Sequence, residues 1–173
     1  MHIPRWPSDE EVCYILKMLE SRLIDYRFTE PWADALIATV EAPPAWICDL
    51  ASRTHQDDLV NTVQGYLISN TDLNTGFQKY HNFHVGCQFL RYKRGEWSWA
   101  QFLKEAGQVT DSSCSSWNCE QFYSHLNILE ESGYTKDVEV CQVAKLIKDP
   151  IFAEVVAIAE EQYWPFRIAR YGA

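Results

Sequence analysis

Several features of familiar enzymes and membrane proteins are missing from this sequence. The seven glycines among 173 residues are isolated, so none forms the glycine-rich loop that cradles a phosphate. There is no HExxH zinc motif and no Ser-His-Asp arrangement of a hydrolase. No run approaches the roughly 18 consecutive apolar residues of a membrane span. The first residues also lack the apolar core of a signal peptide. We therefore expect a cytoplasmic protein that is not an enzyme and uses no cofactor.

Positive charge is also scarce. Fifteen Lys and Arg residues stand against 24 Asp and Glu residues, which gives a formal net charge of −9. Such an excess of negative charge repels phosphate backbones and anionic lipid headgroups. Arg91, Lys93 and Arg94 do cluster, but they end a predicted helix, where the helix dipole attracts cations. The composition thus disfavours direct contact with nucleic acid or with a membrane surface.

The cysteines lack the spacing of a redox or zinc motif. The six cysteines form no CxxC pair. Four of them fall within helical apolar patterns, where a free thiol packs as a small hydrophobic residue. A chain of this length also buries enough apolar surface to fold without disulfides. We expect reduced thiols.

Two groups of residues have the chemistry of a metal or nucleophilic site without its geometry. His81, His84 and Cys87 are spaced three apart on a predicted helix, but the first and last lie about 120° apart around it. A structural zinc site would also need a fourth ligand. Cys114 precedes a predicted helix, and the possible base His125 lies roughly 13 Å further along its axis. We predict no metal and no nucleophile. A metal-dependent hydrolase or structural-zinc protein using His81, His84 and Cys87 is kept as an alternative.

The spacing of apolar residues is helical in every long segment, because they recur at intervals of three, four and seven. Ser8 and Glu11 form a predicted capping box that opens the first helix, and Gly95 and Gly133 follow predicted helix ends. Hydrophobic residues make up 47% of the chain and charged residues 23%, as in ordinary globular proteins. The predicted fold is all-α, a single compact bundle of about eight or nine helices in one domain covering residues 1–173.

Proline and small polar residues mark three expected boundaries. Pro31 is predicted in the first turn of the second helix, where its missing N–H would be unpaired anyway. Residues 108–116 are small and polar and follow a helix that is predicted to stop at Gly107, so we expect a mobile loop there. Residues 165–173 are predicted to form a C-terminal tail that buries its apolar side chains on the bundle.

Aromatic residues are abundant, with 24 in the chain, and one of them has an unusual position. Trp97 falls off the apolar stripe of its predicted helix and stands beside Glu96, so we expect it to be half-exposed. Glu10, Asp57 and Asp58 occupy the first turns of predicted helices, where carboxylates project into solvent. Exposed aromatic rings near carboxylates are typical of protein-binding surfaces. We predict that Glu10, Asp57, Asp58 and Trp97 contact a protein partner.

Two consecutive segments carry a resemblance to known proteins. Residues 32–37 read Trp-Ala-Asp-Ala-Leu-Ile, and residues 43–50 read Pro-Pro-Ala-Trp-Ile-Cys-Asp-Leu. This order of helix, diproline and tryptophan-containing helix resembles helical immunity proteins, which bacteria make against their own secreted toxins. The resemblance covers about 20 residues and transfers no contact residue. It implies an acidic domain that binds and neutralises one toxin or enzyme with a basic active surface.

Two other functions fit the same composition. Phage-encoded inhibitors of bacterial defence enzymes are equally small, acidic and free of catalytic motifs, so they are the first alternative. A helical adaptor in a larger assembly is another, and it would form stable homo-oligomers or bind several partners. The gene neighbourhood would separate these alternatives, because an adjacent toxin gene supports immunity and a phage operon supports a defence inhibitor.

Overall fold

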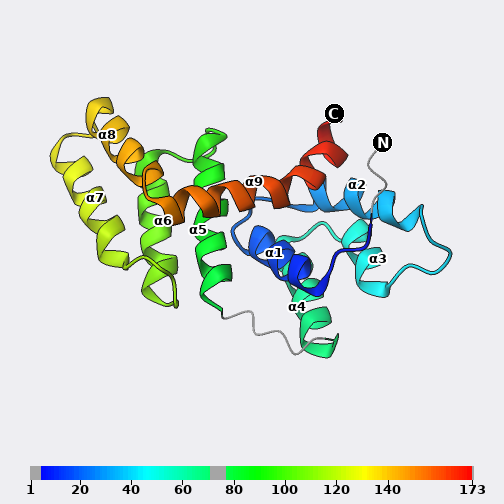
Figure 1. Cartoon of the computed structure of the whole chain (residues 1–173). Coiled ribbons are helices and arrows are strands. Elements are labelled where there is room, and N and C mark those ends of the chain that lie inside the picture. The colour runs from blue at the N-terminus through cyan, green and yellow to red at the C-terminus, as the bar shows by residue number, and fades with distance from the viewer. Residues whose placement is uncertain (1–4, 71–76, 173) are drawn as a thin grey trace. The chain divides into compact units, whose positions relative to one another are not determined.

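The structure is a computed structural model that describes residues 5–70 and 77–172. Within these ranges the chain forms nine α-helices and no strand, which confirms the predicted all-α fold class (Figure 1). No helix in the described part of the chain is both long enough and apolar enough to cross a membrane. Contacts group the described residues into two units, one with residues 5–70 and 161–172 and the other with residues 77–160. The expectation of a single domain stays a prediction.

The first unit is built from two pairs of neighbouring helices. They are α1 (Asp9–Glu20), α2 (Tyr26–Ile37), α3 (Ala45–Ser52) and α4 (Gln56–Asn70), with the last residues of α9 (Pro150–Tyr171). Helix α1 packs on α4, and α2 packs on α3 (Figure 1). The side-chain amide of Gln56 donates to the carbonyl oxygens of Leu19 at 2.6 Å and Ile24 at 3.1 Å. These bonds hold the start of α4 against the end of α1.

The predicted capping box opens α1. Ser8 Oγ accepts the Glu11 N–H at 3.3 Å, and a Glu11 carboxylate oxygen accepts the Ser8 N–H at 2.7 Å. Burial acts to raise the pKa of Glu11, but the Ser8 N–H and the Arg5 guanidinium outweigh it and hold this pKa below its ordinary value. Helix α1 ends at Glu20, and Arg22 then adopts a φ of 58°, which breaks the helical path.

The second helix starts earlier than its proline indicates. Helix α2 begins at Tyr26, so the prediction that Pro31 lies in the first turn is wrong. The reason is an upstream cap, because the Asp25 side chain accepts the Arg27 N–H at 2.9 Å and also pairs with the Arg27 guanidinium. The cap fixes the helix start, and the helix then continues through the proline.

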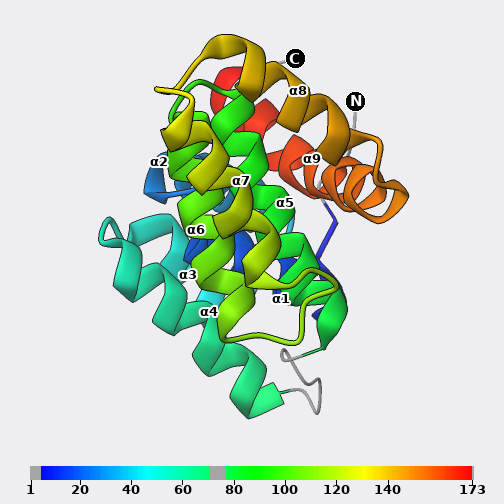
Figure 2. The same ribbon diagram turned by 90° about the vertical axis from the view of Figure 1, so that its left-hand side faces the viewer.

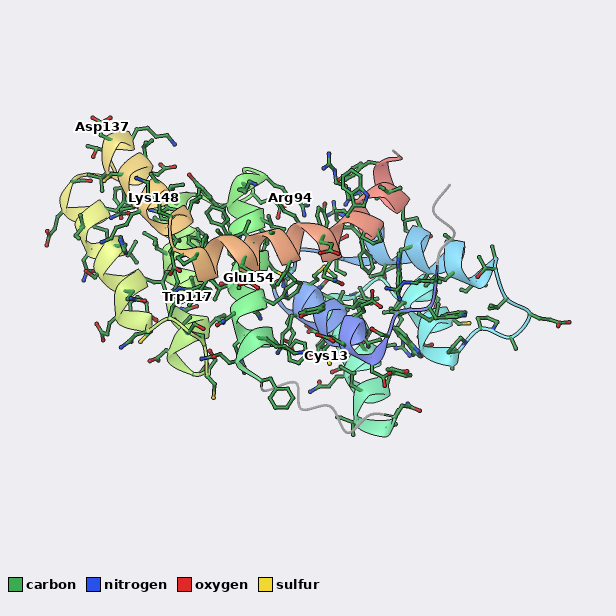
Figure 3. The ribbon with its side chains drawn as sticks, in the orientation of Figure 1. Cys13, Arg94, Trp117, Asp137, Lys148 and Glu154 are labelled. Atoms are coloured by element: carbon green, nitrogen blue, oxygen red, sulfur yellow. The ribbon has the colours of Figure 1, made fainter. Side chains whose placement is uncertain are left out.

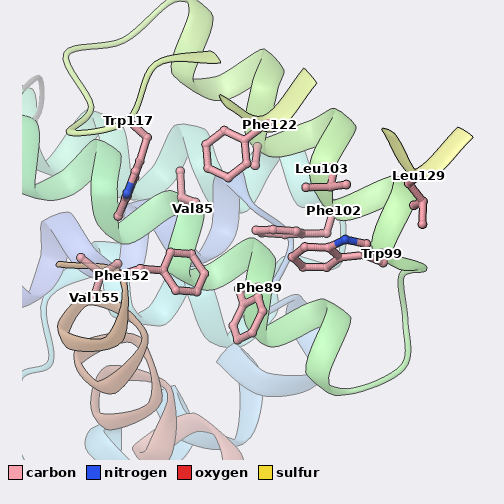
Figure 4. Packing of buried hydrophobic residues seen from close by; sticks show 11 residues of the cluster. Val85, Phe89, Trp99, Phe102, Leu103, Trp117, Phe122, Leu129, Phe152 and Val155 are labelled. Carbon is pink, nitrogen blue, oxygen red and sulfur yellow. The ribbon is translucent and has the colours of Figure 1, made fainter. Parts of the chain in front are cut away.

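The second unit contains a cluster of buried aromatic rings. Its elements are α5 (Gln78–Lys93), α6 (Trp99–Asp111), α7 (Cys119–Glu131), α8 (Lys136–Ile147) and the first part of α9. Helices α6 and α7 run side by side (Figures 1 and 2). Phe102 stacks on Trp99 with ring centroids 4.9 Å apart, and Phe89 meets Phe152 edge to face, also at 4.9 Å (Figure 4). These four rings belong to one buried hydrophobic cluster of the unit.

The predicted loop at residues 108–116 is shorter in the structure. Helix α6 does not stop at Gly107 but continues to Asp111, so residues 108–111 are helical and the connection to α7 is 112–118. Thr110 is buried, and its hydroxyl donates to the carbonyl of Ala106 at 2.8 Å. Packing of α6 on α7 holds this last turn in place, although its sequence is polar.

The predicted C-terminal tail is the end of a helix. Helix α9 runs through Pro165 to Tyr171. Phe166 is buried against Trp32, with ring centroids 4.6 Å apart, whereas Tyr171 is exposed. The helix continues past the proline because contacts of this kind bury one face of it against α2.

All six cysteines are free thiols in the structure. Cys13 and Cys87 are buried in helices, and Cys48, Cys114 and Cys141 are exposed. The Cys119 thiol donates to a carboxylate oxygen of Asp111 at 3.3 Å. Burial and that carboxylate raise the pKa of Cys119, so the neutral thiol is favoured over the nucleophilic thiolate.

Candidate functional site

An open groove of about 550 Å³ lies between α3 and α4 in the first unit. One wall comes from the segment that follows the diproline, including Trp46, Asp49 and Arg53. The other wall is the outer side of α4, including Asp58 and Gly65. The segment that follows the diproline therefore forms one side of this groove.

An aromatic stack forms the apolar part of the groove. The rings of Trp46 and Tyr66 are stacked with their centroids 4.7 Å apart. The Tyr66 hydroxyl donates to Asp9 Oδ1 at 3.2 Å, which connects the stack to the start of α1. Burial and the Asp9 carboxylate raise the pKa of Tyr66, so the hydroxyl stays protonated and acts as the donor. Residues from three helices thus hold the stack in one position before any partner binds.

Gly65 leaves the α4 backbone bare along the groove. A Cβ atom built on Gly65 would meet nothing within 4 Å. By contrast, a Cβ on Gly86 would lie 2.8 Å from a methyl group of Val155, so that glycine is explained by internal packing. A glycine within a helix costs about 1 kcal/mol relative to alanine. No internal contact accounts for that cost at Gly65, and the bare backbone lets another chain approach closely.

The groove lies in an acidic part of the chain. Residues 5–70 contain eleven acidic and five basic residues. Asp58 lines the groove, and Asp57 is exposed beside it in the first turn of α4. Neither carboxylate forms an ion pair with any of the described residues, whereas Asp49 pairs with Arg53 at 3.5 Å. Asp57 and Asp58 are therefore available to a cation from outside the chain.

Glu10 lies at the other end of the same helix pair. It is exposed in the first turn of α1. The bond from Tyr66 to Asp9 brings the start of α1 beside the end of α4, so the two helices run antiparallel. Asp57 and Tyr66 are nine residues apart, which corresponds to roughly 13 Å along a helix. The structure does not bring Glu10 and Asp57 into one patch.

Trp97 belongs to the second unit and is half-buried, as expected from the sequence. Its ring packs against the aromatic core, and the Arg91 guanidinium lies 4.1 Å from the ring centroid. Arg91 also pairs with Glu96 at 2.9 Å, and Arg94 pairs with the same carboxylate at 2.5 Å. One face of the ring is thus covered by a cation that this chain itself supplies.

The residues considered for metal or nucleophilic chemistry differ in their exposure. Cys87 is buried and His81 and His84 are half-buried. In the parts of the chain that the structure describes, no group of three or more His, Cys, Asp or Glu side chains could hold a metal ion. Cys114 is exposed, and His125 Nδ1 lies 2.7 Å from the carbonyl oxygen of Gln121.

A second hollow of about 440 Å³ lies among α6, α7 and α8. Hydrogen bonds join some of the residues that line it. Trp99 Nε1 donates to the Gln142 side-chain oxygen at 2.7 Å, and the Gln142 amide donates to the carbonyl of His125 at 2.9 Å. Burial and the nearby Lys145 lower the pKa of His125, so its neutral form is favoured. Gln142 thus uses its polar group to join α6 and α7 to α8, and we take the α3–α4 groove as the candidate site.

Of the binding residues predicted from the sequence, Asp58 lines the groove and Asp57 lies beside it. Trp46, Gly65 and Tyr66 were not predicted as parts of one surface. The available signal was a glycine within an otherwise regular helix, following a diproline and a tryptophan. Comparison of the chain with protein families, with curated proteins and with solved structures finds no match.

Proposed function

We propose that this chain is a non-catalytic inhibitor that binds a single protein partner, and that the partner is a bacterial toxin with a basic active surface. The observation that carries the proposal is the α3–α4 groove, where unpaired carboxylates stand beside a fixed aromatic stack and a bare stretch of helix backbone. Protein-binding sites commonly combine an aromatic anchor, a polar rim and close backbone approach.

Charge and shape contribute to the proposed binding in different ways. The net charge of −9 attracts a basic surface from a distance and raises the association rate. Asp57 and Asp58 then meet Lys or Arg side chains of the partner at the rim of the groove. The partly exposed Tyr66 ring supplies apolar contact area without a loss of side-chain freedom, because its stack on the buried Trp46 already holds it in place. Trp97 adds a second aromatic contact from the other unit.

The test uses the product of the gene adjacent to the one that encodes this chain. Expressed alone, that product should arrest growth, and co-expression of this chain should restore it. The purified pair should associate rapidly at low salt and more slowly as the salt concentration rises. A neighbouring product that is harmless to cells and does not bind the chain would contradict the proposal. A phage operon around the gene would favour a defence enzyme as the partner.

Charge reversal separates the groove from the general charge of the chain. The variant with Asp57→Lys and Asp58→Lys should associate about tenfold more slowly, because two rim carboxylates become repulsive. The matched control carries Glu130→Lys and Glu131→Lys on α7, which are also adjacent, exposed acids. Equal slowing in both variants would mean that the groove is not the contact surface.

Replacement of Trp97 tests the second aromatic contact. Trp97→Ala should increase the dissociation rate about tenfold or more if the ring is an anchor of the interface. Trp97→Phe is the matched control, because it keeps an aromatic ring beneath the Arg91 guanidinium. Wild-type dissociation in the folded Trp97→Ala variant would remove Trp97 from the proposed surface.

A further inference from the structure

Helix α8 has apolar side chains on two sides. Val138, Val143 and Leu146 are partly buried and pack against the aromatic core of the second unit. Val140 is 56% exposed and Ile147 is 48% exposed, although both belong to the same helix. Single exposed apolar residues are normal in proteins, so their arrangement decides whether these two are informative.

The exposed residues of α8 form one line along the helix. Val140, Ala144 and Ile147 are spaced by four and three residues, which places them on one face. All three are exposed, and we refer to them as the outer stripe. Ala144 lies between the two larger side chains, so another helix could approach closely at the middle of the stripe.

A pair of opposite charges flanks the outer stripe. Asp137 lies at the start of α8 and Lys148 at its end (Figure 3). They are eleven residues apart, close to three helical turns, so both lie on the same flank of the stripe. Both residues are exposed, and neither forms an ion pair with a described residue. The stripe therefore carries a negative charge at one end and a positive charge at the other.

We propose that the outer stripe of α8 binds a second copy of this chain in an antiparallel, two-fold symmetric dimer. In that arrangement Val140 of one copy packs on Ile147 of the other, and Ala144 lies next to the symmetry axis. In the same register, Asp137 and Lys148 of the second copy are offset by two residues along the helix axis. The long lysine side chain spans that offset. Symmetry forms the ion pair twice, once on each side of the axis.

The charges favour a second copy over a foreign protein at this face. Each chain brings both members of the ion pair, so the surface is complementary to itself when one helix is reversed. The basic partner of the proposed function suits the acidic groove of the first unit instead. One short helix from each copy buries little area, so the dimer should be weak, with a Kd on the order of 10–100 μM. Such a dimer differs from the stable oligomers expected of an adaptor.

The test is analytical ultracentrifugation of the full chain over a range of concentrations from about 5 to 500 μM. The weight-average mass should rise from the 20.1 kDa of one chain toward twice that value. Lys148→Asp or Asp137→Lys should each weaken the dimer about tenfold, because both ion pairs become repulsive. The double variant with Asp137→Lys and Lys148→Asp should dimerise about as well as the wild type, since the charges are only exchanged.

The controls change charge elsewhere by the same amount. Lys104→Asp on α6 and Glu154→Lys on α9 alter exposed residues and should leave the dimer unchanged. Circular dichroism of each variant establishes that it is folded. A wild-type chain that stays monomeric at every concentration would overturn the proposal. Equal weakening by Lys148→Asp and Lys104→Asp, or a folded double variant that does not recover, would also overturn it. These measurements need no toxin, so their outcome is independent of the proposed function.

Discussion

The backbone of Gly107 lies directly against the ring of Tyr123. A Cβ atom on Gly107 would stand 2.5 Å from Cε1 of Tyr123 and 2.8 Å from its Cζ. Carbon atoms that are not bonded pack at roughly 3.5–4.0 Å, so an alanine cannot be accommodated here without movement. Gly107 thus lets the Tyr123 ring of α7 pack directly on the backbone of α6, which explains a glycine within a helix.

Gly107→Ala should therefore destabilise the protein, even though alanine is the better helix former. We expect the free energy of unfolding to fall by about 1–3 kcal/mol, as for other overpacked sites. Urea denaturation followed by circular dichroism measures this change. Combining Gly107→Ala with Tyr123→Ala should cost less than the sum of the single changes, because the clash is then absent. A Gly107→Ala variant as stable as the wild type would contradict the close contact.

Gly65→Ala should have the opposite effect. A Cβ at position 65 meets nothing within 4 Å, and alanine restricts the unfolded chain more than glycine does. We expect the free energy of unfolding to rise by about 0.5–1 kcal/mol, with a higher melting temperature. The pair of glycine variants is internally controlled, since the same substitution is made in two helices of one protein. A loss of stability at position 65 would point to an internal contact.

Local signals in the sequence predicted many of the helix boundaries correctly. The capping box of Ser8 and Glu11 forms as expected. Gly95 and Gly133 adopt φ values of +72° and +70° directly after helices, the left-handed conformation that ends a helix. These features depend on residues a few positions apart, so they can be read from one stretch of sequence.

The errors occur where distant contacts outweigh local preference. Gly107 resembles a helix end, but its contact with Tyr123 holds it within α6. Pro165 resembles the start of a tail, but burial of Phe166 against Trp32 keeps α9 helical beyond it. The stack of Trp46 on Tyr66 joins residues 20 positions apart, and the helical period of either segment contains no sign of it. The candidate groove could be assembled only from the structure.

Acid should destabilise the caps of α1 and α2. Burial acts to raise the pKa values of Glu11 and Asp25, but backbone N–H groups and the Arg5 and Arg27 guanidinium groups hold both below their ordinary values. The unfolded chain therefore binds protons at these carboxyls more readily than the folded chain does. Their contribution is fully present above the unfolded pKa, near 4, and is lost as the pH falls through the lower folded pKa values.

The measurement for these caps is urea denaturation at a series of pH values from about 6 to 2.5. Glu11→Gln and Asp25→Asn keep hydrogen-bonding groups at the caps but remove the titrating charge. The double variant should be less stable than the wild type at pH 6, and its stability should fall less steeply below about pH 4. Parallel pH curves for the variant and the wild type would show that these two carboxyls do not govern the acid sensitivity.

Gln142 should be the residue of α8 whose polar group matters most for stability. Its side chain accepts from the buried Trp99 indole N–H at 2.7 Å and donates to the carbonyl of His125 at 2.9 Å, so it joins α6, α7 and α8. Gln142→Leu fills similar space but leaves the Trp99 N–H without an acceptor, which should cost about 1–3 kcal/mol of unfolding free energy. Trp99→Phe removes that donor, so the loss caused by Gln142→Leu should be smaller when it is measured in the Trp99→Phe background. Equal losses in both backgrounds would mean that the hydrogen bond from Trp99 contributes nothing, and that Gln142 acts only through its bond to His125 or its packing.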